Sequence, residues 1–137
     1  MRVIGFNEEH IKLEVPRSGD IRTTLSTITY TSEITYEFLI VPLGLKTDLG
    51  SIPQILQNIF PKDGLAMFAY ILHDWLYKQG KYTQSVCDDI LEEAMQSLGV
   101  GYWTRKSVRM GLRIGGSKAY QEHRRNDEIS NNSNTTT

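Results

Sequence analysis

The apolar run LAMFAYILHDWLYK, residues 65–78, constrains the fold more than any other part of the sequence. Its apolar side chains have helical spacing, but they occupy nearly the whole circumference of the helix they predict. A helix with so little polar surface is buried on most sides. The other segments of the chain must therefore cover this helix, and we expect the fold to be built around it.

The ends of this helix carry clear sequence signals. Asp63 is a good N-cap residue, and Gly80 is the type of residue that ends a helix. The prediction is therefore a helix from about Leu65 to Lys78. A second helix, capped by Thr83 or Ser85, is expected to run to about Leu98.

A third helix is predicted over about residues 104–123, and the polar residues 124–137 are expected to form a flexible tail. With 137 residues, 39% of them hydrophobic, the chain has the size of one domain. We therefore predict a single domain over residues 1–123. The N-terminal residues MRVIGFNEEH indicate neither a signal peptide nor a membrane span. The single cysteine, Cys87, favours a reducing cytosol or a particle assembled there as the location.

The first third of the chain favours β-structure. Residues 11–15 alternate between apolar and polar, residues 21–32 are rich in β-branched side chains, and residues 34–42 end in an apolar run. We expect a small antiparallel meander over about residues 11–41. A loop with the sequence GLKTDLGSIP follows at residues 44–53. The fold class is therefore α+β, with a small N-terminal antiparallel sheet followed by three helices packed on it.

Two polar residues interrupt the apolar helix in its middle. His73 and Asp74 are about 100° apart on the helix, and Tyr77 lies one turn from His73 on the same face. A short connection makes the next helix return antiparallel beside the first. On that second helix Asp88 borders the buried side, whereas Asp89 faces water. Asp88 is therefore the expected carboxylate partner of His73.

A buried histidine with a carboxylate partner has the composition of a general base, because its imidazole titrates nearest to neutral pH. Asp74, in an apolar helix, needs an arginine, a metal ion or several donors to stay charged. The same residues also fit a hydrogen-bonded core network with no catalytic role. The residues alone leave both interpretations open.

The motifs GLKTDLGSIP, HDWLY and CDDILEEAM, in this order and spacing, resemble those of the 1353 domain-of-unknown-function family of phages and prophages. The resemblance covers about residues 36–120 and implies a phage origin, without a settled activity. It also implies a set of signature residues: Asp48, Ser51, Pro53, His73, Asp74, Tyr77 and Asp88.

HDWLY with an acidic residue on the next helix is also similar to the H-D-x-x-Y plus Asp arrangement of phospholipase A2. This resemblance implies that His73 activates water, that Asp74 binds calcium, and that Tyr77 and Asp88 hold the far nitrogen of the imidazole. The glycine-rich calcium loop and the disulfides of those enzymes are absent. Asp48 is the nearest candidate for a second oxygen ligand of a divalent cation.

Positive charge is concentrated late in the chain. Residues 102–125 contain seven basic side chains and one acidic, although the whole chain has a net charge of −1. Arg105, Arg109 and Arg113 recur at four-residue spacing and form a basic ridge. The ridge either pairs with acidic residues of the second helix (Asp89, Glu92 or Glu93) or meets an anionic surface or another phage protein. No aromatic residues interleave the arginines, so nucleic-acid binding is unsupported.

Two functions follow as expectations. The first is a phage-encoded accessory hydrolase in which His73, oriented by Asp88, activates water while Asp74 and Asp48 bind a divalent cation. A lipid ester, a peptidoglycan amide and a phosphoester all remain candidates for the bond that is cleaved. The second is a non-enzymatic phage structural or assembly protein, in which the same residues form a buried packing network.

Overall fold

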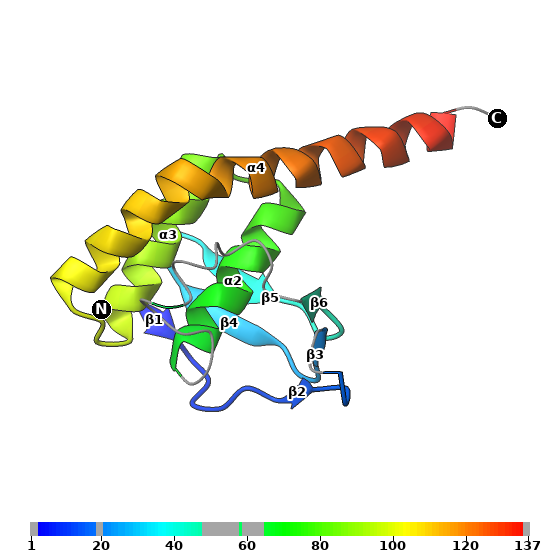
Figure 1. The fold of residues 1–137 in the computed structure, drawn as a ribbon. Coiled ribbons are helices and arrows are strands. Elements are labelled where there is room, and N and C mark those ends of the chain that lie inside the picture. The colour runs from blue at the N-terminus through cyan, green and yellow to red at the C-terminus, as the bar shows by residue number, and fades with distance from the viewer. Residues whose placement is uncertain (1–2, 19–20, 48–57, 59–64, 136–137) are drawn as a thin grey trace.

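The structure is a computed structural model that describes residues 3–18, 21–47, 58 and 65–135. Six short strands and three helices lie in this part of the chain (Figure 1). In chain order they are β1 (Gly5–Phe6), β2 (Leu13–Glu14), β3 (Arg22–Thr24), β4 (Ile28–Thr31), β5 (Phe38–Val41), β6 (Lys46–Thr47), α2 (Leu65–Gln79), α3 (Gln84–Ser97) and α4 (Tyr102–Thr135).

The strands form two antiparallel sheets with the orders β1-β4-β5 and β2-β3-β6. The α+β class is confirmed, but the single meander expected over residues 11–41 is wrong. Thr24, at the end of β3, explains the difference. Its hydroxyl donates to the Pro42 carbonyl at 2.8 Å and accepts the Leu45 N–H at 2.9 Å. These bonds hold the end of β3 against the segment before β6, so β3 and β4 join different sheets.

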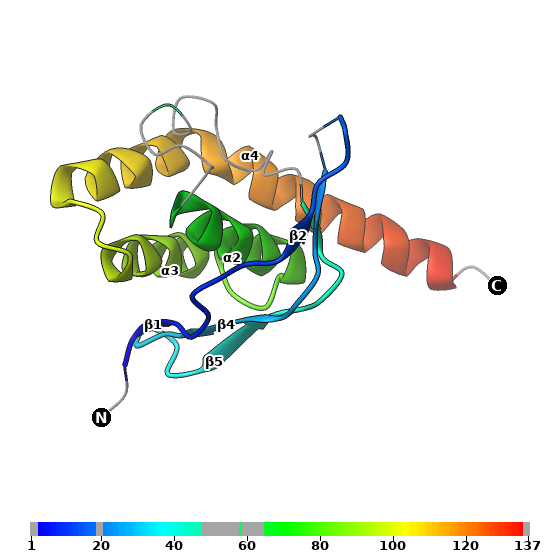
Figure 2. The same cartoon turned by 90° about the horizontal axis from the view of Figure 1, so that it is seen from below.

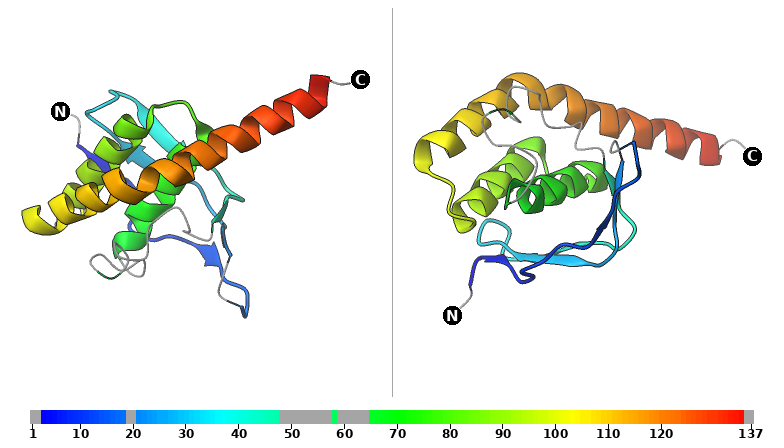
Figure 3. Two further views of the ribbon diagram at one scale, coloured as in Figure 1. Left: turned by 45° about the horizontal axis from the view of Figure 1, so that its top comes forward. Right: turned by 60° about the horizontal axis from the view of Figure 1, so that its bottom comes forward.

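The helices and the β1-β4-β5 sheet form three layers (Figure 3). α4 covers one side, α2 and α3 lie next to each other in the middle, and the sheet covers the other side (Figures 2 and 3). α2 therefore has neighbours on most of its circumference, as its apolar sequence requires. Its buried hydrophobic side chains are Ala66, Ala69, Tyr70, Ile71, Leu72, Leu76 and Tyr77.

The C-terminal end of α2 depends on a glycine. Gly80 has φ +72°, in the left-handed region, and a Cβ atom added there would lie 1.3 Å from Arg124 Nη1. Arg124 donates to the Tyr77 carbonyl at 2.6 Å and to the Lys78 carbonyl at 3.2 Å. Glycine is therefore needed for the backbone angle, and an added Cβ would also displace the end of the Arg124 side chain. The predicted N-cap Asp63 lies outside the described residues.

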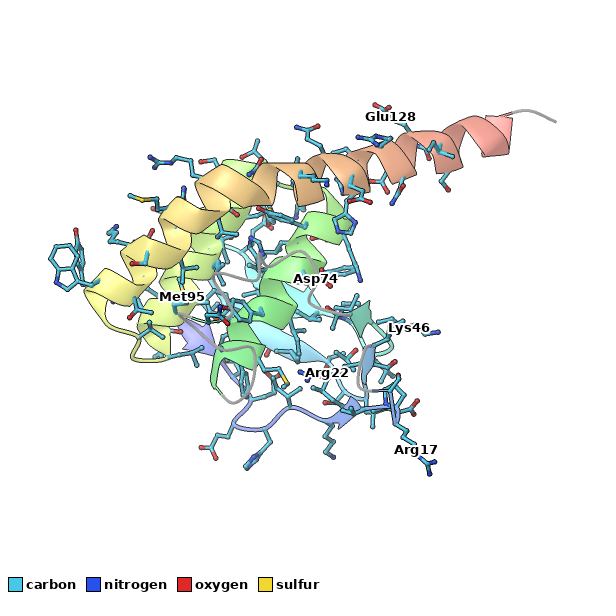
Figure 4. The ribbon with its side chains drawn as sticks, in the orientation of Figure 1. Arg17, Arg22, Lys46, Asp74, Met95 and Glu128 are labelled. Carbon is cyan, nitrogen blue, oxygen red and sulfur yellow. The ribbon has the colours of Figure 1, made fainter. Side chains whose placement is uncertain are left out.

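α3 begins as the sequence predicts, because the Thr83 hydroxyl accepts the Val86 N–H at 3.3 Å. α4 differs from its prediction: it does not end near residue 123 but continues through most of the expected tail. Figures 1 and 4 show this last part, which carries Glu128, extending beyond the other elements. No proline or glycine follows Gly116, so nothing in the sequence stops the helix.

Candidate functional site

α2 and α3 bring three polar side chains together in the interior. His73 Nε2 lies 2.8 Å from Asp88 Oδ1, and the Tyr77 hydroxyl donates to the same oxygen at 2.7 Å. His73 and Tyr77 are 0% exposed, and Asp88 is 5% exposed. We call these three residues the polar cluster. The structure thus brings together the residues that the sequence selected as a candidate base, its tyrosine neighbour and its carboxylate partner.

Helical spacing explains how the cluster forms. His73 and Tyr77 are one turn apart on α2, and their ring centroids lie 4.1 Å apart. Ala69 lies one turn before His73 and is fully buried, so a small side chain stands beside the imidazole. Asp88 reaches both rings because the first turns of α3 return beside the last turns of α2.

The bond to Asp88 assigns the proton of the imidazole. A carboxylate accepts, so Nε2 of neutral His73 carries the hydrogen and Nδ1 carries a lone pair. Within the described part of the chain, the buried Nδ1 atom has no hydrogen-bond partner. Buried polar atoms usually have one. Nδ1 is therefore the atom of the cluster that is free to accept a proton.

Tyr77 and the neighbouring Cys87 are held in their neutral forms. Burial raises the pKa of Tyr77, and its hydrogen bond to Asp88 raises it further. Tyr77 therefore remains a hydrogen-bond donor at neutral pH. Burial also raises the pKa of the adjacent Cys87 thiol to about 12, with a smaller contribution from the charge of Asp88. Cys87 is therefore no candidate nucleophile.

Asp74 lies on α2 (Figure 4) but does not belong to the polar cluster. It is 2% exposed, and its Oδ2 lies 3.2 Å from Nζ of Lys78, one turn later. Lys78 also donates to the Lys46 carbonyl. The buried charge of Asp74 is thus balanced by a lysine, a partner that the spacing of the two residues could have predicted.

The metal ligands predicted from the sequence are only partly described. Asp48 lies outside the described residues, as do Ser51 and Pro53 of the same motif. Among the residues that are described, no group of three or more His, Cys, Asp or Glu side chains could hold a metal ion. Binding of calcium by Asp74 and Asp48 therefore stays a prediction.

Two of the three arginines in the basic ridge of α4 have partners among the described residues, and only Arg109 pairs with an acidic side chain. Lys106 lies 2.6 Å from Glu92, and Arg109 lies 2.5 Å from Asp89, as one of the two interpretations expected. Arg105 instead donates to the Val100 carbonyl at 2.6 Å. Arg113 is exposed. Glu93, the third expected partner, turns away and accepts hydrogen bonds from the Tyr30 hydroxyl and the Glu33 N–H.

A hollow of about 350 Å³ lies between the first turns of α3 and the N-terminal half of α4. Its lining residues are Gln84, Ser85, Asp88, Arg109 and Arg113. We call it the arginine hollow. The sequence shows the four-residue spacing of the two arginines, but only the packing of α4 on α3 shows that they lie beside Asp88. The carboxylate that orients His73 therefore also borders an open space.

The fold and the cluster define a small α+β domain with a buried His-Asp-Tyr network between two antiparallel helices. The family model described as "Protein of unknown function (DUF1353)" matches residues 23–111, which is more than half of the chain. The chain belongs to this family. The matched segment contains the whole polar cluster. No curated protein and no solved structure matches the chain. None of the helices in the described ranges has the length and apolar character needed to cross a membrane.

Proposed function

We propose that this protein is a hydrolase in which His73 acts as the general base. The observation that supports the proposal is the geometry of the imidazole: Asp88 holds Nε2–H, and the lone pair of Nδ1 has no partner in the described part of the chain. Tyr77 fixes Asp88 from a second direction. This arrangement sets the tautomer and orientation that a base requires.

The proposed chemistry is addition of water across an ester, amide or phosphoester bond. Nδ1 takes one proton from water, and the oxygen of that water attacks the carbonyl carbon or the phosphorus. The imidazolium that forms is stabilised by the Asp88 carboxylate 2.8 Å from Nε2. The proton on Nδ1 then passes to the leaving group, which restores neutral His73.

The bacteriophage origin and the accessory role belong to this proposal, and the motif pattern of residues 44–53, 73–77 and 87–95 supports them. A divalent cation bound by Asp74 and Asp48 is a further proposal, and none of the steps above depends on it. Asp74 would have to exchange its contact with Lys78 for the cation. Such an exchange predicts competition between Lys78 and the metal ion.

A second candidate function is a structural or assembly role for the same fold. The complete burial of His73 and Tyr77 favours it, because a base must be reached by water whereas a packing network need not be. In that role the cluster fixes how α2 and α3 pack. The two candidates are distinguished by comparing a variant that keeps the donor to Asp88 but lacks Nδ1 with a variant that lacks that donor as well.

The experiment compares His73→Gln with His73→Asn. The glutamine amide reaches the position of Nε2 and can still donate to Asp88, whereas the shorter asparagine cannot. The enzyme and both variants are tested against chromogenic esters, amides and phosphoesters, and their stability is measured by urea denaturation. The hydrolase proposal expects both variants to lose about 10²–10⁴-fold in activity, with His73→Gln retaining most of the stability.

Two results would contradict the hydrolase proposal. One is hydrolysis by His73→Gln at the rate of the unmodified protein. The other is the absence of hydrolysis of every substrate by the unmodified protein, combined with a loss of about 1–3 kcal/mol of stability in His73→Asn. The second result would support the structural role.

A further inference from the structure

The arginine hollow has no part in the function proposed above. Asp88 lines it, but His73 does not. All five lining side chains are polar or charged. A hollow of this composition does not suit an apolar ligand, and its volume of about 350 Å³ is sufficient for a small molecule.

Two guanidinium groups border the hollow from α4. Arg109 and Arg113 are one helical turn apart and therefore project from the same face. Arg109 is held in place by Asp89, 2.5 Å away, and its side chain is 20% exposed. Arg113 is exposed, and it makes no hydrogen bond or ion pair with any residue in the described ranges. One guanidinium is thus fixed, and the other is available to a ligand.

The acidic residue in the lining does not cancel this charge. Asp88 accepts hydrogen bonds from His73 and Tyr77 at Oδ1, which hold this carboxylate against α2 rather than against Arg113. Only 6% of its side chain is exposed. Ser85 and Gln84 add neutral hydrogen-bond donors on the same helix, one turn before Asp88. The hollow therefore offers positive charge and hydrogen-bond donors to solvent, and this combination suits an oxyanion.

We propose that the arginine hollow binds a phosphate group, either as free phosphate or as a phosphate monoester. Guanidinium groups bind phosphate through paired N–H···O contacts, and a tetrahedral dianion can contact two guanidinium groups at once. A carboxylate has one negative charge and one plane of acceptors, so it matches only one of them. Arg113 makes the main contact, and Arg109 makes the second.

This proposal is independent of whether His73 is a base, because no atom of His73 lines the hollow. It is tested by titrating the full chain with inorganic phosphate at constant ionic strength, with backbone amide NMR shifts and calorimetry as readouts. The amides of Gln84 and Ser85 are expected to shift. Arg113→Gln is expected to weaken binding about ten- to a hundredfold, because it removes charge-assisted hydrogen bonds.

Arg125→Gln is the matched control. Arg125 is also exposed on α4 and carries the same charge, but it does not line the hollow. The proposal expects this control to bind phosphate as the unmodified protein does. Equal weakening in the two variants would mean general charge attraction and would overturn the proposal. Both substitutions are on the surface, so neither is expected to prevent folding.

Three additional titrations complete the test. Phenyl phosphate is expected to bind at least as well as phosphate, and tighter binding would assign the ester as the ligand. Acetate is expected to bind at least tenfold more weakly than phosphate, and equal binding would overturn the assignment to phosphate. His73→Gln is expected to bind phosphate normally. If it does so while showing unchanged hydrolysis, the function proposed for His73 is wrong and the phosphate site stands.

Discussion

Replacement of Asp88 by alanine is the most informative perturbation of the polar cluster. Asp88 Oδ1 accepts from His73 Nε2 at 2.8 Å and from the Tyr77 hydroxyl at 2.7 Å, and both donors are 0% exposed. Without the carboxylate, two buried donors lose their acceptor. A buried unsatisfied polar group costs about 1–3 kcal/mol. We therefore expect Asp88→Ala to reduce the free energy of unfolding by about 3–5 kcal/mol.

Urea denaturation followed by circular dichroism measures this loss, with Asp89→Ala as the matched control. Asp89 is the next residue of α3, but its side chain is 45% exposed and forms an ion pair with Arg109. Its loss should cost about 1 kcal/mol or less. If Asp88→Ala is too unstable to purify, Tyr77→Phe removes one of the two bonds and is expected to cost about 1–2 kcal/mol.

A double-mutant cycle separates the cluster from general packing. In the Asp88→Ala background, Tyr77→Phe should cost much less than in the unmodified protein, because the hydroxyl has already lost its acceptor. The reasoning would be refuted if Asp88→Ala and Asp89→Ala had equal stabilities, or if the two substitutions in the cluster were additive.

Three further outcomes are expected. Gly80→Ala should destabilise the protein by about 1–3 kcal/mol, because alanine is strained at this positive φ and its Cβ would displace the end of Arg124. Gly99 is also at positive φ but in open space, so Gly99→Ala should cost less. Thermal unfolding measures the stability of both variants. Stability should fall as pH rises above about 9, because the unfolded chain releases the Cys87 proton while burial holds the folded pKa near 12. The fall is at most about 1.4 kcal/mol per pH unit for this group, and urea denaturation at pH 9 and 10 should show a smaller fall in Cys87→Ala. Calcium should raise the melting temperature if Asp74 takes part in a cation site. Lys78→Met should enlarge this shift, because Lys78 no longer competes with the ion for Asp74. No shift with calcium, magnesium, manganese or zinc in either protein would exclude the proposed cation.

The middle of the fold could be predicted from the sequence because local rules determine it. The apolar run of α2 and the cap at Thr83 fix where α2 and α3 lie, and both helices are found close to the predicted residues. The choice of Asp88 over Asp89 required only the helical angle and the short connection. Both inferences use contacts within one helix or between sequence neighbours.

The remainder depends on contacts that no local rule gives. The division of the strands into two sheets follows from the bonds of Thr24 to residues 18 and 21 positions away. The arginine hollow depends on the angle at which α4 packs on α3. The continuation of α4 is a different case, because its polar end has no helix-breaking residue and composition alone suggested a tail.

Nitrogen-15 NMR of the His73 ring tests the central claim most directly. The account predicts that Nε2 carries the proton at neutral pH, that Nδ1 has the shift of an unprotonated nitrogen, and that this pattern is lost in Asp88→Ala. The signals of His73 are identified by their loss in His73→Gln, which keeps those of His10 and His123. A proton on Nδ1, or a ring that is unaffected by the loss of Asp88, would contradict the account.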